Sequence, residues 1–138
     1  ECPNASWNGT YISFCPGLTT DDVTAHEWAH AYTEYTNNLI YQWQSGALNE
    51  SYSDIWGETV DRINGREDSI GPDVARTDNS CSDYTPGNSP GSGDDSVRWL
   101  LGEDATAVGL TGALRDMWNP TCQGDPGKVT DAEYYCCG

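Results

Sequence analysis

Both histidines of the chain lie in one pentapeptide, His26-Glu27-Trp28-Ala29-His30. On a helix, residues four apart lie on the same face, so both imidazoles can bind one metal ion. Glu27, next to the first histidine, is then placed to take a proton from an attacking water molecule. The pentapeptide therefore predicts a helix that carries two zinc ligands and a base.

A second helical pattern follows about twenty residues later and offers a third zinc ligand, Glu50. One turn further on, Asp54 is able to orient an imidazole without binding the metal. With Asp61, these residues form a polar stripe, which on its own is as typical of a surface face as of a buried site. Because the paired histidines are available, we favour the buried-ligand interpretation. Together the two patterns predict a zinc hydrolase site.

Local signals predict three elements around this site. Asn8-Gly9 within residues 7–14 indicates a β-hairpin. Thr19 or Thr20 caps a first helix that reaches about Thr36. A second helix is expected over residues 47–63, where apolar side chains recur with a helical period. These are Leu48, Tyr52, Ile55, Trp56, Thr59 and Ile63.

The remainder of the chain gives weaker signals. Residues 65–95 are rich in Gly, Pro, Ser and Asp, so we expect a long surface loop there. Residues 97–101 and 106–118 are expected to form short helical or irregular core segments. No apolar run approaches the roughly 20 residues that a membrane-spanning helix needs.

Composition excludes several classes of partner. The 138 residues include 22 acidic and 6 basic side chains, giving a net charge of −16. Nucleic acid and anionic membranes are therefore not expected to bind, because phosphate groups attract the opposite charge. A solvated surface is the ordinary role of most of these carboxylates, but calcium is a natural counterion for some of them.

Six cysteines are typical of a secreted, extracellular protein. Cys2 and Cys15 flank the predicted hairpin and are expected to form a disulfide. For Cys122, pairings with Cys81 and with Cys136 compete. Glycosylation sequons begin at Asn4, Asn8 and Asn49, and we discount the last because it lies in the predicted metal-binding helix.

The two helical patterns and the segment between them resemble the thermolysin-like zinc metallopeptidases. The resemblance is carried by residues 25–31, Tyr35-Thr36, residues 39–42, residues 45–50 and residues 53–55. It extends more weakly from Asn4 to Pro126. It implies an α+β, predominantly helical fold, with a zincin-like core of two helices that carry the site and a small N-terminal hairpin.

The resemblance also implies roles for individual residues. His26, His30 and Glu50 correspond to zinc ligands, and Glu27 corresponds to the general base. Tyr41 would donate a hydrogen bond to the oxyanion, and Asp54 would support His26. An interface aromatic is the ordinary alternative for Tyr41.

Further matched positions imply how a substrate binds. Asn4 and Ala5 would hold an extended peptide through their backbone groups, and Arg115 would bind a substrate carbonyl. The ordinary alternative for Arg115 is a structural ion pair. Val23, Leu101 and Leu114 match a pocket for a bulky hydrophobic residue after the scissile bond, although all three could equally be core residues.

The family's double calcium site is matched only in part. Asp22, Asp61 and Glu103 occupy ligand positions, whereas Arg98 and Leu100 replace two acidic residues. A single calcium ion is therefore expected rather than a pair.

Departures from the family qualify the functional prediction. Members carry a further histidine that stabilises the reaction intermediate, but both histidines here are assigned to zinc. We therefore expect residues 1–138 to be a single, truncated catalytic domain that acts as a weakly active secreted endopeptidase on peptides or proteins. The alternative is a non-catalytic extracellular structural or assembly module that retains zinc. Either form could associate with itself or with missing companion lobes through exposed apolar surface.

Overall fold

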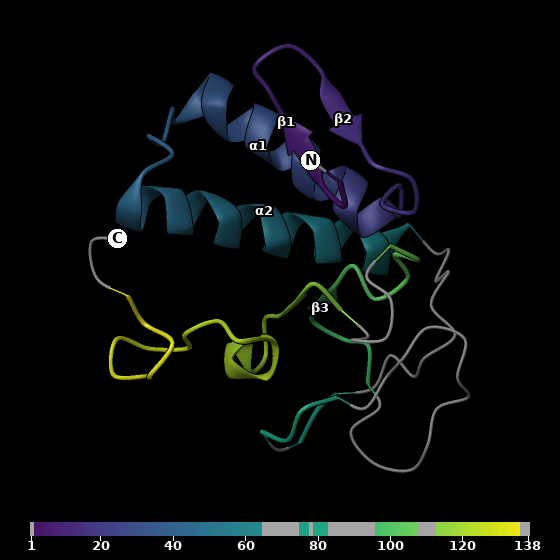
Figure 1. Cartoon of the computed structure of the whole chain (residues 1–138). Coiled ribbons are helices and arrows are strands. Elements are labelled where there is room, and N and C mark those ends of the chain that lie inside the picture. Colours follow the sequence, from purple (N-terminus) through teal and green to yellow (C-terminus); the bar gives the residue numbers. More distant parts are fainter. Residues whose placement is uncertain (1, 65–74, 78, 83–95, 108–112, 136–138) are drawn as a thin grey trace.

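The computed structural model of the chain describes residues 2–64, 75–77, 79–82, 96–107 and 113–135. Two long helices lie between a β-hairpin and an irregular C-terminal part that holds two short strands and a 3-10 helix (Figure 1). The predicted fold class, α+β and predominantly helical, is confirmed by this arrangement. In the described part of the chain, no helix combines the length and the apolar character that crossing a bilayer requires.

The hairpin consists of β1 (Ala5–Trp7) and β2 (Ile12–Phe14), which pair antiparallel with Ser6 opposite Ser13. Its turn is closed by the Asn8 side chain, whose amide oxygen accepts the backbone N–H groups of Thr10 and Tyr11 at 3.0 Å each. A disulfide joins Cys2 and Cys15 at the open end. The turn chemistry of Asn8 and the disulfide therefore hold the hairpin at both ends.

The two helices are α1 (Asp21–Thr36) and α2 (Trp43–Ile63). Helix α1 begins after Thr20 and ends before Asn37, in agreement with the predicted limits. Helix α2 begins at Trp43 rather than at the predicted Ala47. Its first turn forms across Ser45-Gly46 because the Gly46 N–H donates to the Gln42 carbonyl at 3.1 Å.

The two helices approach closely where α2 has no side chain. A Cβ atom at Gly57 would lie 2.6 Å from the Asp22 carbonyl oxygen and 3.1 Å from Leu101. Any larger residue would therefore push α2 away from α1. This contact fixes how far apart the two helices stand and hence where their facing side chains meet.

Helix α2 buries its polar face. Asp54 and Asp61 are 5% and 8% exposed, whereas the apolar residues whose spacing predicted the helix point to solvent. The exposed apolar side chains are Leu48, Tyr52, Ile55, Trp56 and Ile63, with 46–75% of their surface accessible. The polar stripe of α2 is thus buried, as favoured from the sequence, and Asp54 within it is paired with His26 and Arg115.

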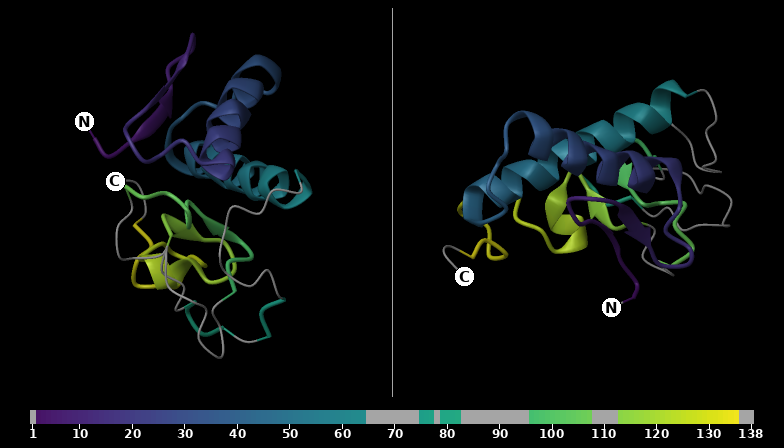
Figure 2. Two further views of the ribbon diagram at one scale, coloured as in Figure 1. Left: turned by 90° about the vertical axis from the view of Figure 1, so that its right-hand side faces the viewer. Right: turned by 90° about the horizontal axis from the view of Figure 1, so that it is seen from above.

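The C-terminal part packs beneath the two helices (Figure 2). Strands β3 (Leu100–Leu101) and β4 (Arg115–Asp116) pair antiparallel, and the 3-10 helix η2 (Pro120–Gln123) follows. Val97 and Leu100 are buried, but this segment ends in a strand rather than in a helix. Of the segment predicted over residues 106–118, residues 108–112 lie outside the described residues.

Most of the loop predicted over residues 65–95 also lies outside the described residues, namely 65–74, 78 and 83–95. Within the described part, Arg76 is buried rather than exposed, and its Nη1 lies 2.8 Å and 2.9 Å from the two carboxylate oxygens of Asp116. A disulfide joins Cys81 to Cys122, whereas Cys136 and Cys137 are outside the described residues. Arg76 and Cys81 therefore pin the described part to the C-terminal segment, while Ala75, Thr77 and residues 79–80 are exposed, as expected of a surface loop.

Candidate metal centre

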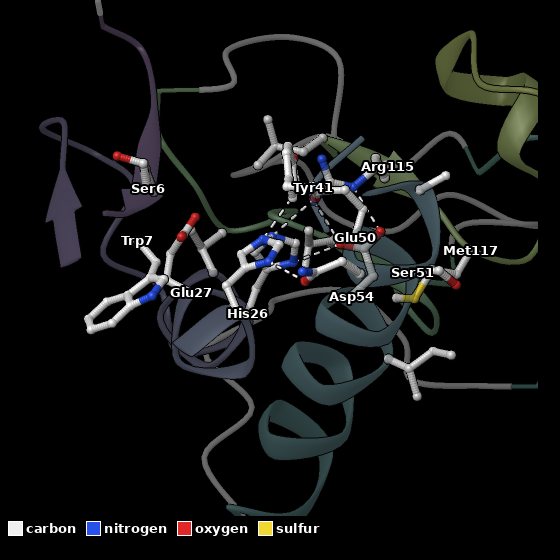
Figure 3. A pocket seen from close by; sticks show the side chains of 18 of the residues that line it. Ser6, Trp7, His26, Glu27, Tyr41, Glu50, Ser51, Asp54, Arg115 and Met117 are labelled. Atoms are coloured by element: carbon white, nitrogen blue, oxygen red, sulfur yellow. Dashed lines mark hydrogen bonds and ion pairs between the residues drawn. The ribbon is translucent and has the colours of Figure 1, made fainter. Parts of the chain in front are cut away.

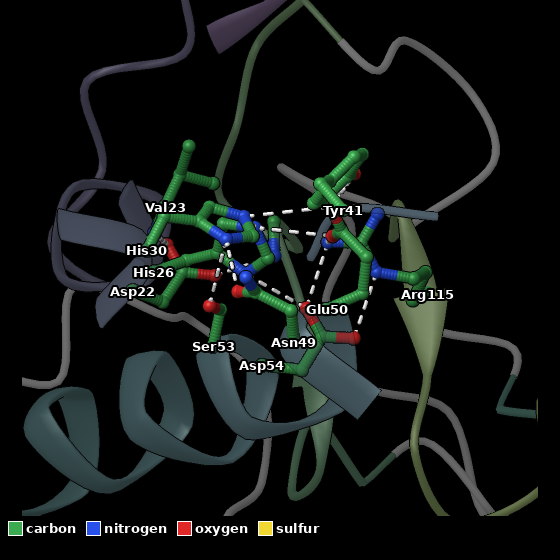
Figure 4. Close-up of polar contacts among 11 residues, drawn as sticks. Asp22, Val23, His26, His30, Tyr41, Asn49, Glu50, Ser53, Asp54 and Arg115 are labelled. Carbon is green, nitrogen blue, oxygen red and sulfur yellow. Dashed lines mark hydrogen bonds and ion pairs between the residues drawn. The ribbon is translucent and has the colours of Figure 1, made fainter. Parts of the chain in front are cut away.

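Helices α1 and α2 bring together His26, His30 and Glu50, the three residues predicted to bind zinc (Figure 4). The Nε2 atoms of the two histidines lie 2.8 Å apart. The Glu50 oxygens lie 3.4 Å from His26 Nε2 and 3.5 Å from His30 Nε2. Two imidazole nitrogens and a carboxylate oxygen that converge on one point are a donor set that fits Zn²⁺.

Each histidine is oriented from its other ring nitrogen. His26 Nδ1 lies 2.8 Å from Asp54, which also accepts two hydrogen bonds from Arg115 at 2.7 and 2.8 Å. His30 Nδ1 lies 2.7 Å from the Asn49 side-chain oxygen and 3.2 Å from the Ser53 hydroxyl. The sequence analysis assigned no role to Asn49 and Ser53, although they lie four residues apart on the face that carries Glu50 and Asp54. Such contacts fix the ring orientation that metal binding needs.

Opposite charges set the protonation of this cluster. Burial opposes a positive charge on His26, but Asp54 and Glu50 outweigh it and raise the pKa of His26 to about 9. Burial also opposes a negative charge on Glu50, but hydrogen bonds with His26 and Tyr41 lower its pKa to about 2. At neutral pH the metal-free cluster therefore pairs a charged His26 with a charged Glu50, and a metal ion has to displace a proton.

Glu27 lies beside the converging histidines, on the wall of an open cleft of about 1760 Å³ (Figure 3). Its side chain is 5% exposed, and burial raises its pKa above the usual value, while His26 and His30 oppose that shift. The backbone N–H of Trp7 in β1 opposes the rise in the pKa of Glu27 as well. A carboxylate with a raised pKa is suited to accept a proton and return it near neutral pH.

Tyr41, which precedes α2, and Arg115, which lies in β4, both reach Glu50. The Tyr41 hydroxyl donates to Glu50, and burial and the Glu50 charge raise the pKa of this phenol, so it stays protonated and can donate. Nη2 of Arg115 lies 3.7 Å from Glu50 and 2.7 Å from Asp54. Both side chains line the cleft.

The remaining predicted substrate contacts also line the cleft. Asn4 and Ala5 lie at its rim on and before β1, and Val23, Leu101 and Leu114 form part of its wall. Val23 and Leu101 are 3% and 1% exposed, whereas Leu114 is 39% exposed. The first two therefore serve as core residues as well as cleft wall, and Leu114 offers the accessible apolar surface.

A second group, here called the acidic cluster, comprises Glu58, Asp61 and Glu103, with one oxygen of each within 4.8 Å of the others. Two of its members were predicted as calcium ligands, whereas Glu58 was not, although it continues the stripe of Glu50 and Asp54. Asp22, the third predicted ligand, instead accepts the backbone N–H groups of Val23 and Gly102.

Burial sets the protonation of two members of the acidic cluster. Glu103 is 2% exposed, and among the described residues its Oε2 atom has no hydrogen-bond partner. Burial and the neighbouring carboxylates raise the pKa of Glu103 well above its usual range and that of Asp61 to about 8. Three buried carboxyl groups this close together fit a divalent cation bound through oxygen, and the raised pKa values of two of them agree with this.

Comparisons with known proteins relate the chain to metallopeptidases. Residues 37–136 match the family model described as thermolysin metallopeptidase, alpha-helical domain. The chain is 37% identical over 128 residues to a zinc metalloproteinase of Renibacterium salmoninarum, a match that covers 91% of the chain and 18% of that protein. It is 35% identical over 135 residues to a thermolysin of Alicyclobacillus acidocaldarius, covering 89% and 19%.

A bacillolysin of Brevibacillus brevis is similarly related, at 37% identity over 132 residues, with 89% of the chain and 19% of that protein covered. The fold and the paired histidines on α1 are those of the zinc metallopeptidase class. Within that class, the chain belongs to the thermolysin-like metallopeptidase family. It spans about a fifth of the length of the curated relatives it matches.

Proposed function

We propose that the chain is a zinc-dependent endopeptidase that cleaves peptide bonds before bulky hydrophobic residues. One observation carries the proposal: His26, His30 and Glu50 converge within 4.8 Å beside the buried carboxylate of Glu27, on the wall of an open cleft. A site built only to stabilise a fold closes the fourth zinc position with another ligand and needs no neighbouring base.

When bound, zinc polarises a carbonyl and lowers the pKa of water toward about 7. Glu27 accepts a proton from the attacking water and returns it to the leaving amine. Tyr41 remains protonated and donates to the oxygen that gains negative charge, at the cleft face of Glu50. Arg115, held by its two hydrogen bonds to Asp54, offers its remaining donors to a substrate carbonyl.

The substrate lies along β1 in extended form. Ala5 provides backbone groups at the free edge of β1, and an added peptide strand would pair with them. The predicted pairing through the Asn4 backbone is not kept, because the Asn4 carbonyl accepts the N–H of Cys15, next to β2, and Asn4 lies beside the peptide at the rim of the cleft. The residue after the scissile bond packs against Leu114, with Val23 and Leu101 behind it. This apolar wall supports a preference for a bulky hydrophobic residue.

The acidic cluster binds one calcium ion in this proposal. The unpartnered oxygen of Glu103 and the raised pKa values of Glu103 and Asp61 support it, because a divalent cation stabilises the charged form of all three carboxylates. Glu58 takes the place that the resemblance assigned to Asp22, whose oxygens are engaged by backbone N–H groups.

The protein acts outside the cell. Two disulfides, Cys2–Cys15 and Cys81–Cys122, support this location, since such bonds persist in oxidising compartments. Glycans at Asn4 and Asn8 are compatible with their exposed positions. Asn49 is 6% exposed and contacts His30, which argues against a glycan there.

A second candidate is a zinc-retaining assembly module without catalysis. It is favoured by the exposed aromatic side chains on α1 and α2, where Tyr32 and Trp56 stack with ring centroids 5.7 Å apart. Concentration-dependent mass in sedimentation velocity, combined with no peptide cleavage by the zinc-loaded chain, would favour this candidate. A monomer that cleaves peptides would exclude it.

The test is a Glu27→Gln substitution in the zinc-loaded chain, assayed on a peptide with leucine after the scissile bond. Loss of the base should lower the cleavage rate by about 10²–10⁴-fold. Zinc content, measured by atomic absorption, should stay at the wild-type value. A zinc chelator should abolish wild-type cleavage, and added zinc should restore it.

Glu133→Gln makes the same chemical change at a residue that does not line the cleft, so it should leave cleavage unchanged. Undiminished cleavage by Glu27→Gln would refute the role of Glu27. Absence of cleavage by the zinc-loaded wild-type chain would refute the proposed activity of these 138 residues.

A further inference from the structure

We propose that Glu34 is a positioning residue that holds strand β1 at the cleft and thereby sets the register of a bound peptide. The proposal rests on the proposed function. Trp7, the last residue of β1, donates its indole N–H to Glu34 Oε2 at 2.6 Å. Glu34 lies two turns after Glu27 on α1 and lines the same cleft.

Trp7 is attached to α1 through its side chain, because its indole N–H donates to Glu34. Its backbone N–H faces the side on which Glu27 lies and lowers the pKa of that carboxyl group. Because residues seven apart lie on one face of a helix, Glu27 and Glu34 both face β1. The bond to Glu34 therefore sets the position of Trp7 along the helix axis.

Few other contacts support the tip of the hairpin. The Tyr35 hydroxyl donates to the Gly9 carbonyl at 3.4 Å, and the Tyr35 ring meets the Trp7 ring edge-on with centroids 6.4 Å apart. Both contacts are long and lie on the exposed side of α1. The short hydrogen bond from Trp7 to Glu34 is the strongest link between the tip and the helix, since its acceptor carries a charge.

The geometry of β1 connects this link to peptide binding. The Asn4 carbonyl accepts the Cys15 N–H at 2.8 Å, so Asn4 turns its backbone toward β2. Alternate residues of an antiparallel strand turn to opposite edges, and hence Ala5 and Trp7 present their backbone groups to the other edge. The effect of the Trp7 N–H on the pKa of Glu27 agrees with this direction. A tilt of β1 would displace the Ala5 groups that pair with a substrate.

The role requires an acceptor oxygen at residue 34 and a donor on residue 7, and it does not require a negative charge. Glu34→Ala removes the acceptor, whereas Glu34→Gln keeps an oxygen that can accept the indole N–H. Trp7→Phe removes the donor but keeps an aromatic ring against Tyr35. If the two residues act through one bond, the double variant should be no worse than either single variant.

The experiment compares two substrates on the zinc-loaded chain. A six-residue peptide with leucine after the scissile bond pairs along β1, whereas a blocked dipeptide with the same leucine is too short to do so. Glu34→Ala and Trp7→Phe should each raise KM for the six-residue peptide about tenfold, the effect of one charge-assisted hydrogen bond. Their kcat, and both constants for the dipeptide, should stay within twofold of wild type.

Glu34→Gln should restore the KM for the six-residue peptide. Equal losses on both substrates, failure of Glu34→Gln to rescue, or additive losses in the double variant would each overturn the proposal. Circular dichroism and zinc content are measured on every variant, and Glu34→Gln preserves the test if Glu34→Ala does not fold.

Binding is measured separately from cleavage, by fluorescence anisotropy of the labelled six-residue peptide. Weaker binding by Glu34→Ala than by wild type, with rescue by Glu34→Gln, would support the role of Glu34 even if the wild-type chain cleaved nothing. That result would refute the proposed activity alone. Equal binding by wild type and Glu34→Ala would overturn the role of Glu34.

Discussion

The buried face of α2 carries two charged clusters that differ in how their charge is balanced. At its N-terminal half, Glu50 and Asp54 face His26 and Arg115, and the pKa of Glu50 falls to about 2. At its C-terminal half, Glu58 and Asp61 face another carboxyl group, and the pKa of Asp61 rises to about 8. One helix face thus holds a cluster in which carboxylates face cations and a cluster in which carboxyl groups face one another.

This difference predicts different tasks for the two proposed metal ions. The histidine cluster, which comprises His26, His30 and Glu50, is electrostatically balanced without zinc, because His26 carries a proton where the metal would bind. In the acidic cluster, Asp61 and Glu103 must bind protons or a cation to remain buried. Zinc is therefore expected to govern activity, and calcium is expected to govern stability.

The largest expected effect is on the pH dependence of stability without metals. The raised pKa of Asp61, from 3.8 to about 8, means that the folded chain holds a proton which the unfolded chain has lost. This stabilisation is complete below about pH 4 and is lost as the pH rises through 8. His26, raised from 6.5 to about 9, loses its contribution in a higher window.

Thermal unfolding at pH 5, 6, 7, 8 and 9 separates the two clusters. In metal-free buffer the melting temperature should fall throughout this range. Calcium should flatten the decline up to about pH 8, where Asp61 titrates, and zinc should flatten it between about pH 6.5 and 9, where His26 titrates. A melting temperature that stays constant from pH 5 to 6.5 without metals would contradict the assignment of the acidic cluster.

The second largest effect is on zinc affinity and involves the histidine cluster alone. Asp54→Asn removes the charge that holds both His26 and Arg115. Loss of such a supporting contact should weaken zinc binding by about 10–100-fold, as measured by competition with a chelator of known affinity. The calcium dependence of the melting temperature should stay as in wild type.

Asp131→Asn is the matched control, since Asp131 accepts hydrogen bonds only in the local turn with Gly127 and Lys128 among the contacts described for it. It should leave zinc affinity unchanged. Wild-type zinc affinity in Asp54→Asn would show that Asp54 does not orient His26.

Much of the histidine cluster could be predicted from the sequence because its geometry is local. The spacing between His26 and His30, and between Glu50 and Asp54, places each pair on one face of a helix whatever the rest of the chain does. The limits of α1 followed from Thr20 and Asn37 for the same reason. What is encoded within one or two helical turns can be recognised without the fold.

The buried side of α2 could not be predicted from its helical period alone, and the buried-ligand interpretation depended on the paired histidines of α1. A helical period defines a face, but it does not say whether that face meets protein or solvent, which depends on partners such as Arg115, 61 residues from Asp54. The buried pair of Arg76 and Asp116 is likewise set by residues 40 apart in the sequence. Neither pairing leaves a periodic signal in the sequence.

The smallest expected effect is that of Glu103→Gln on the free energy of unfolding, which should change sign when calcium is added. In calcium-free buffer, Glu103→Gln replaces a carboxyl group that must take up a proton to remain buried by a neutral amide, so the unfolding free energy should rise by about 1 kcal/mol. With saturating calcium the same substitution removes a ligand, and the unfolding free energy should fall. Thermal and urea unfolding measure both, and about 1 kcal/mol corresponds to a shift of roughly 3 °C. A substitution that destabilises the chain equally with and without calcium would identify Glu103 as an ordinary packing residue. A reversal of sign would instead support the difference between the two halves of the buried α2 face. In the N-terminal half the carboxylates are balanced by the proton on His26, and in the C-terminal half they are balanced by a divalent cation at Glu103.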